Sequence, residues 1–144
     1  MPIQILLVED SPGDVRLMRE AFLDANGDIN MNVAIDGVEA MEFLKRRGSF
    51  SNAPRPDLII LDLNLPKMDG QEVLAQIKED KELGSIPTVI LTTSDADSDI
   101  VKSYDLHANC FLTKPVRLDQ FELLIQRIYN FWVATAKLPK ARSI

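Results

Sequence analysis

The stretch LIILDLNLPKMDG, residues 58–70, decides the fold of this chain. Its first four residues are apolar throughout, as in a parallel strand that is covered on both faces. Asp62 follows directly, with Leu63 and Leu65 around it. An ionised carboxylate in apolar surroundings is costly unless it is paired or coordinated. The stretch therefore predicts a buried strand whose terminal acid has a partner.

Four more apolar runs have the length of a strand: IQILLV (3–8), MNVAI (31–35), TVILT (88–92) and NCFLT (109–113). Stretches with apolar residues at helical spacing separate them, and Ser11, Asp36 and Asp69 stand where helix caps are expected. Alternating strands and helices predict an α/β domain with right-handed crossovers. We expect a doubly wound, five-stranded parallel sheet with five helices.

The length of 144 residues predicts one domain with a core of its own. We place this domain at residues 1–136 and a C-terminal tail at residues 137–144. The formal charge of −6 disfavours nucleic acid as a partner, because nucleic-acid binders usually carry a basic face. No basic leader and no apolar run approaching about 20 residues is present, so we expect a cytoplasmic protein without a membrane partner.

Function in such sheets gathers beyond the carboxyl ends of the strands. The residues that end the apolar runs are polar: Glu9 and Asp10, Asp62, Thr92 and Thr93, and Thr113 with Lys114. Three carboxylates, hydroxyl groups and an ammonium group are therefore expected to meet at one rim of the sheet.

Carboxylates that lie together repel one another, so they need shared protons or a cation. Mg²⁺ suits a few carboxylates, water molecules and a phosphate oxygen. A carboxylate, Mg²⁺, a lysine and a threonine hydroxyl are also the groups that receive a phosphoryl group, and an aspartate can form an aspartyl-phosphate. Taken alone, Asp62 is more simply a turn-initiating acid, and Thr92 could equally well be an ordinary strand residue. The grouping at one rim favours the chemical interpretation.

These motifs carry a family resemblance. LLVEDS, LIILDLNLPKMDG, VILTTS and FLTKP together resemble the receiver domain of two-component response regulators, over residues 3 to about 130. The resemblance implies a flavodoxin-like sheet with strand order 2-1-3-4-5. It also implies a phosphorelay protein that is not a classical enzyme but catalyses its own phosphorylation and dephosphorylation.

The resemblance implies a role for each matching residue. Asp62 would accept the phosphoryl group from a phosphohistidine of a partner histidine kinase. Glu9 and Asp10 would hold Mg²⁺ together with Asp62, aided by the backbone carbonyl of Asn64, and Mn²⁺ or Ca²⁺ could substitute.

Three further residues complete the implied switch. Thr92 would move its hydroxyl toward the phosphoryl group, and Lys114 would pair with the same group. Phe111 takes the place of the switch aromatic, which is often tyrosine in relatives. The resemblance also implies a cis peptide bond between Lys114 and Pro115.

Other features resemble the single-domain response regulators of cyanobacterial phytochromes. They are the strand NCFLTKP, the dipeptide FW in the last helix, the tail ATAKLP and the extended loop RRGSFSNAPRPD. This likeness implies light signalling through a phytochrome-type kinase.

The last helix carries more apolar surface than one sheet face requires. Phe121, Ile125, Ile128 and Trp132 form a core-facing stripe, and Phe131 widens it. A surplus of exposed aromatic surface often marks a protein contact. We therefore expect a homodimer in which Phe131 and Trp132 take part.

Two other functions remain possible from the sequence. The first is a Mg²⁺-dependent phosphatase or phosphotransferase with Asp62 as covalent nucleophile, although such enzymes usually need a lid, for which this chain has no long insertion. The second is a flavodoxin-like cofactor binder. The acidic loop EDSPGD after the first strand argues against it, because acids repel a phosphate unless a metal intervenes.

Overall fold

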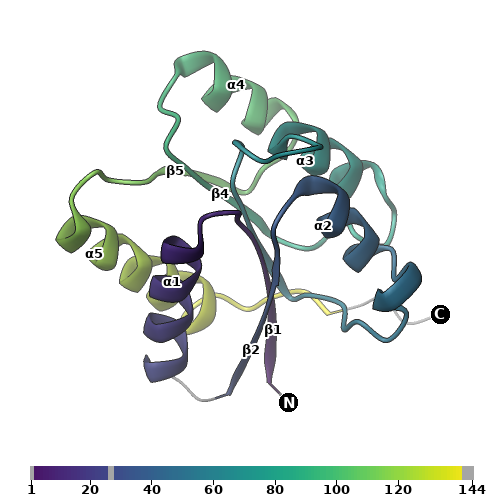
Figure 1. The fold of residues 1–144 in the computed structure, drawn as a ribbon, viewed down its shortest axis with the longest axis horizontal. Coiled ribbons are helices and arrows are strands. Elements are labelled where there is room, and N and C mark those ends of the chain that lie inside the picture. Colours follow the sequence, from purple (N-terminus) through teal and green to yellow (C-terminus); the bar gives the residue numbers. More distant parts are fainter. Residues whose placement is uncertain (1, 26–27, 141–144) are drawn as a thin grey trace.

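The computed structural model describes residues 2–25 and 28–140 of the chain. Five parallel strands form one sheet in the order β2-β1-β3-β4-β5 (Figure 1). The strands are β1 (Ile3–Val8), β2 (Ile29–Ala34), β3 (Leu58–Leu61), β4 (Thr88–Thr92) and β5 (Cys110–Thr113). The predicted doubly wound sheet and its strand order are confirmed.

Five α-helices cover both faces of the sheet. They are α1 (Pro12–Ala25), α2 (Gly37–Leu44), α3 (Gly70–Glu79), α4 (Asp97–Asp105) and α5 (Leu118–Ile128). Helices α1 and α5 lie on one face, and α2, α3 and α4 lie on the other (Figure 1). A short 3₁₀ turn, η1 (Gly48–Phe50), and a π-helical turn, η2 (Tyr129–Val133), complete the described elements.

The central strands are apolar throughout because both of their faces are buried. All four residues of β3 and all five of β4 are buried. Alternate residues of β3 serve the two cores: Ile59 packs with α2 and α3, while Ile60 packs with α1 and α5. This explains the continuous apolar runs of the sequence.

Side-chain caps start the helices that follow β2 and β3. Asp36 accepts a hydrogen bond from the backbone N–H of Glu39, and Asp69 accepts one from Glu72. Both aspartates therefore satisfy an N–H group that the first helical turn leaves without a partner. The caps fix where the chain turns from the sheet rim into α2 and α3.

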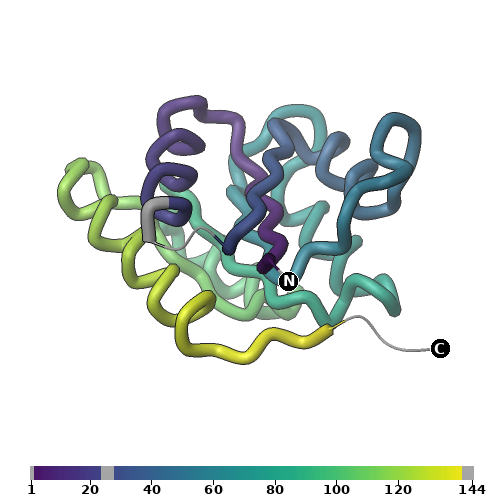
Figure 2. The backbone as a smooth tube through the Cα atoms, turned by 90° about the horizontal axis from the view of Figure 1, so that it is seen from below, coloured from purple at the N-terminus to yellow at the C-terminus, as the bar shows by residue number. Residues whose placement is uncertain are grey.

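The end of the chain departs from one continuous last helix. Helix α5 ends at Ile128, and the chain continues as η2, in which Ala134 N–H donates to the carbonyl of Tyr129. The following segment, yellow in Figure 2, continues past η2 and away from α5 along the lower edge of the view. Leu138 of this segment packs on the core shared by α1 and α5. The division at residues 136 and 137 stays a prediction, and residues 141–144 of the expected tail lie outside the described part.

Among the described residues no peptide bond is cis. The bond between Lys114 and Pro115 is therefore trans, and the cis geometry that the resemblance implied is wrong for this structure. Trans is also the form that an X-Pro bond favours, by about 0.5–1 kcal/mol.

Candidate phosphoacceptor and metal site

Three acids from two neighbouring strand ends meet at the carboxyl rim of the sheet. Glu9 and Asp10 follow β1, and Asp62 follows β3, whose residues pair with β1 in parallel. One carboxylate oxygen of each acid lies within 4.8 Å of those of the other two. Glu9 and Asp62 are buried, whereas Asp10 is exposed. The rim lies where β1 has β2 on one side and β3 on the other, which is the topological switch point of the sheet.

Lys114 joins these acids from the end of β5. Its Nζ donates to Glu9 Oε1, to Asp14 Oδ2 at 2.9 Å and to Asp62 Oδ2 at 3.2 Å. Only 6% of the Lys114 side chain is exposed. The structure thus brings Lys114 to the acids, as the strand ends predicted. It also adds Asp14, which sequence reasoning missed.

Burial and hydrogen bonding oppose each other in the two central groups, Glu9 and Lys114. Burial raises the pKa of Glu9 to about 7, because it outweighs the lowering effect of the hydrogen bond from Lys114. Burial also lowers the pKa of Lys114, but the hydrogen bonds to Glu9 and Asp14 outweigh it and hold that pKa above its ordinary value. The neighbouring carboxylates therefore have the ammonium group of Lys114 as a partner, and Glu9 can hold a proton near pH 7.

The loop after Asp62 holds the phosphoacceptor candidate in place. Asp62 N–H donates to the carbonyl of Val8, and Asp62 Oδ1 accepts from the N–H of Asn64 at 3.1 Å. Gly70 N–H donates back to the carbonyl of Leu63 at 2.9 Å. A Cβ atom on Gly70 would lie 2.2 Å from the carbonyl oxygen of Asp62. Glycine is required there because the start of α3 touches the backbone of Asp62.

Thr92 lies fully buried at the end of β4. Its Oγ1 accepts from Asn64 Nδ2 and from the N–H of Ser94, each at 3.4 Å. Asn64 therefore links the loop after Asp62 to the predicted switch hydroxyl. The assignment of its backbone carbonyl as a metal ligand stays a prediction.

Phe111 lies in β5, partly buried against the core of α2 and α3. Its N–H donates to the hydroxyl of Tyr104 on α4 at 3.1 Å. A phenolic hydroxyl of α4 thus binds the backbone of the predicted switch aromatic.

The two predicted dimer residues lie in η2, beyond α5. Phe131 is 56% exposed, whereas Trp132 is partly buried and packs on the core of α1 and α5. Their rings meet edge to face with centroids 5.1 Å apart. Only Phe131 therefore offers a largely exposed aromatic ring.

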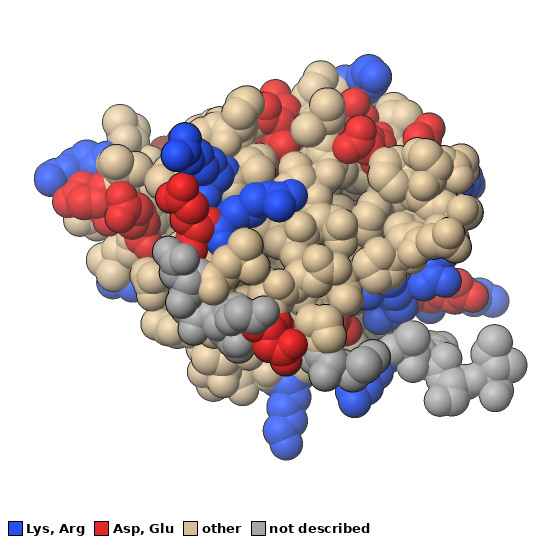
Figure 3. Space-filling model, turned by 60° about the horizontal axis from the view of Figure 1, so that its bottom comes forward, with Lys and Arg blue, Asp and Glu red and all other residues tan. Residues whose placement is uncertain are grey.

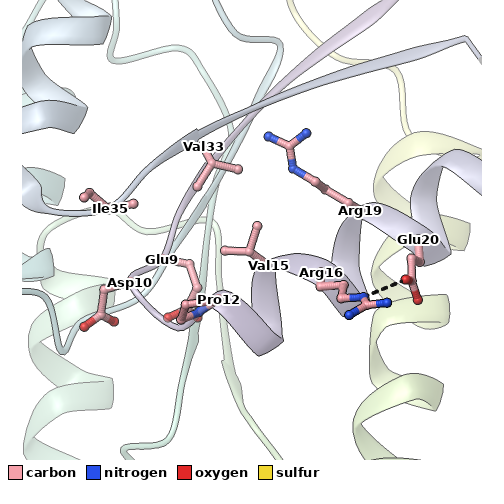
Figure 4. A pocket seen from close by; sticks show the side chains of 9 residues that line it. All are labelled: Glu9, Asp10, Pro12, Val15, Arg16, Arg19, Glu20, Val33 and Ile35. Atoms are coloured by element: carbon pink, nitrogen blue, oxygen red, sulfur yellow. Dashed lines mark hydrogen bonds and ion pairs between the residues drawn. The ribbon is translucent and has the colours of Figure 1, made fainter.

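A pocket of about 490 Å³ opens beside Glu9 and Asp10. Figure 4 shows Val15 of α1 and Val33 of β2 facing each other across it, with the ion pair of Arg16 and Glu20 at its far end. The acids therefore stand at the edge of an apolar hollow rather than inside an enclosed cavity.

The donor set fits a hard divalent cation. Mg²⁺ prefers oxygen ligands and is held in proteins by one or two carboxylates, with water and phosphate oxygens completing its shell. Glu9, Asp10 and Asp62 supply three carboxylates within reach of one ion, and no histidine or thiol belongs to this described group. A cation there would also relieve the repulsion among the acids.

The surface charge concerns nucleic acid as a partner, and the length of the helices concerns a membrane. On the face shown in Figure 3, Lys and Arg side chains mostly lie near Asp and Glu side chains and do not form one basic surface. Within the described residues, no helix combines the length and apolar character that a bilayer crossing requires.

Known proteins match the chain over nearly its whole length. The family model described as the response regulator receiver domain matches residues 5–126. Response regulator Rcp1 from Synechocystis is 49% identical over 140 residues, which cover 97% of this chain and 95% of that protein.

Two solved structures agree with this fold at a TM-score of 0.94 and 48% identity. The Mn²⁺-bound form of Rcp1 aligns with 96% of this chain, and the phosphorylated cyanobacterial phytochrome response regulator RcpA aligns with 97%. In both cases the whole of the solved chain is covered.

Proposed function

The chain belongs to the family of response regulator receiver domains, and on that premise we propose that Asp62 accepts a phosphoryl group from a partner histidine kinase. The observation that carries the proposal is the meeting of Glu9, Asp10 and Asp62 with the ammonium group of Lys114 at one rim. Positioning and charge neutralisation are the main needs of phosphoryl transfer. These residues meet both.

The transfer uses the groups of this chain as follows. A carboxylate oxygen of Asp62 attacks the phosphorus of the phosphohistidine, a P–O bond forms as the P–N bond breaks, and the imidazole leaves and takes up a proton from solvent. Lys114 lies within hydrogen-bond distance of Asp62 Oδ2 and can donate to the arriving phosphoryl oxygens. Thr92 can turn its hydroxyl from Asn64 toward the same oxygens.

We assign the metal site to Glu9, Asp10, Asp62 and the backbone carbonyl of Asn64. Mg²⁺, when bound there, neutralises charge that develops on the phosphoryl oxygens. The similar protein Rcp1 has an Mn²⁺-bound form, which supports a divalent cation as the ligand of the proposed site and Mn²⁺ as a substitute.

Phosphorylation of Asp62 would signal to a partner by changing the surface of the protein. The turn of Thr92 would release its hydrogen bonds to Asn64 and Ser94, and Phe111 would repack beside α4. Such a change shifts a population between two states of α4, β5 and α5. We propose that the resulting surface is read by a partner or by a second copy of this chain, through Phe131 and Trp132.

Phytochrome-type signalling is the pathway that the likeness favours. RcpA, 48% identical to this chain, is a phytochrome response regulator for which a phosphorylated structure exists. The proposed kinase is therefore one that carries a light-sensing chromophore domain.

Intact mass after incubation with acetyl phosphate and Mg²⁺ tests the phosphoacceptor. We expect one added phosphate that alkali removes, no phosphate without Mg²⁺, and none on the Asp62→Asn variant. Acetyl phosphate tests Asp62 without any need for the kinase. An unmodified wild-type protein would contradict the proposal, and release of many phosphates per chain would favour a phosphatase.

A further inference from the structure

Three carboxylates share the ammonium group of Lys114, and they are not equivalent. Glu9 and Asp62 belong to the acidic group that fits a divalent cation. Asp14 contacts Nζ at 2.9 Å but is outside that group. Asp14 is therefore the one partner of Lys114 that a bound cation would leave unchanged.

The fold fixes Asp14 in this position. Helix α1 begins at Pro12, directly after the acidic end of β1, and Asp14 lies in its first turn. Asp14 N–H donates to the hydroxyl of Ser11 at 3.4 Å. The Asp14 side chain is 26% exposed, against 6% for Lys114. The carboxylate thus reaches the buried ammonium group from the solvent side of the rim.

The charges around Lys114 then set up a competition. When Glu9 and Asp62 face a cation, Asp14 is the carboxylate that remains for the ammonium group. A phosphoryl group that arrives at Asp62 also needs Lys114 as a donor, because an ionised donor and acceptor form the stronger hydrogen bonds. Asp14 therefore competes with the phosphoryl group for the hydrogen bonds that Lys114 donates.

We propose that Asp14 is a positioning residue that restrains Lys114 and thereby slows phosphoryl transfer to Asp62. The inference rests on the proposed function for the transfer step, but the contact it depends on exists before any phosphate arrives. Without Asp14, the ammonium group would move fully onto Glu9 and Asp62 in the metal-free protein. It would then compete with the cation for these two carboxylates.

Two measurements on the Asp14→Asn variant test the restraint. At saturating Mg²⁺, we expect kcat/KM for acetyl phosphate to rise about fivefold, mainly through a lower KM, because Lys114 is freed to donate to the phosphoryl group. In calorimetric titration of the unphosphorylated protein, we expect Mg²⁺ to bind about threefold more weakly, because Lys114 then occupies the metal carboxylates.

Three variants separate this role from a structural one. Asp14→Glu keeps the carboxylate and should stay near the wild type in both measurements. Glu20→Gln removes the same charge from the same helix without touching Lys114 and should change neither value. In a Lys114→Ala background, Asp14→Asn should have little further effect, because the residue through which it acts is gone.

Each result decides the inference. A kcat/KM that is unchanged or lower in Asp14→Asn, or an equal change in Glu20→Gln, would overturn it. Persistence of the full effect in the Lys114→Ala background would also overturn it. If the wild type takes up no phosphate, the proposed function fails, and the Mg²⁺ titrations alone then decide whether Asp14 restrains Lys114.

Discussion

Gly70 shows how tightly one residue can constrain the phosphoacceptor. A Cβ atom there would lie 2.2 Å from the carbonyl oxygen of Asp62 and 2.6 Å from the Cα atom of Leu63. Both neighbours are backbone atoms, so no side chain can move aside to make room. We expect Gly70→Ala to lower the free energy of unfolding by about 3 kcal/mol, the upper range for overpacking. Urea denaturation of the metal-free protein measures this loss.

Gly13 is the matched control for that substitution. It lies in the first turn of α1, where no atom comes within 4 Å of an added Cβ. Gly13→Ala should leave stability unchanged or raise it by up to about 1 kcal/mol, since alanine is the better helix former. Equal stability of the two variants would show that α3 does not press on the Asp62 loop.

Single residues also differ in how well the sequence predicts their place in the site. Glu9, Asp62 and Lys114 each follow an apolar strand, so the parallel sheet alone brings them to one rim. Asp14 lies inside a helix, and its contact with Lys114 depends on how α1 leans over the rim. The acidic pattern EDSPGD was the only available signal, and it does not say which acid turns inward.

At the scale of elements, an ion pair ties α2 to the turn after α3. Lys45 Nζ lies 2.5 Å from Asp80 Oδ2, and Asp80 also accepts hydrogen bonds from the N–H groups of Glu82 and Leu83. The hydrogen bond with Lys45 is the main cause that lowers the pKa of Asp80 below its ordinary value of 3.8. Asp80 is thus an acid whose ionised form is favoured in the folded state.

The lowered pKa of Asp80 determines how its contribution to the free energy of unfolding changes with pH. The ionised carboxylate stabilises the fold above pH 3.8, and the contribution is lost as pH falls through the lower, folded-state pKa. We expect Asp80→Asn to lower the free energy of unfolding at pH 7 by about 0.5–1 kcal/mol, as for a partly exposed pair. The difference from the wild type should vanish toward pH 3 in denaturant titrations. In a Lys45→Met background, a difference of the same size at pH 7 would contradict the role of the pair.

Element boundaries were predictable in strands that lie in the interior of the sheet. The apolar runs 3–8 and 88–92 coincide with β1 and β4. Strand β2 lies at the edge of the sheet and begins earlier than predicted, at Ile29, because Asn30 and Asn32 interrupt its apolar pattern. The turn η2 has apolar residues at nearly helical spacing, so sequence periodicity does not distinguish it from α5.

For the whole molecule, three of the exposed apolar side chains of the described surface lie along and beyond α5. Leu118 is 58% exposed, Leu123 43% and Phe131 56%, although Phe121, Ile125 and Ile128 are buried as the core-facing stripe predicted. The sheet therefore buries one side of this helix and leaves these three side chains outside the core. Burying exposed apolar side chains against a second copy removes apolar area from water, which stabilises association.

The dimer is tested best through Phe131, whose ring is exposed but braced by Trp132. We expect the wild type to sediment as a dimer at micromolar concentration, and Phe131→Asp to shift it toward the monomer by at least about tenfold in Kd, because a charge would be buried in an apolar contact. Val101→Asp is the matched control, since Val101 on α4 is 60% exposed and lies outside the proposed contact. A monomeric wild type in sedimentation velocity would rule out the dimer, and equal weakening by both substitutions would place the contact elsewhere.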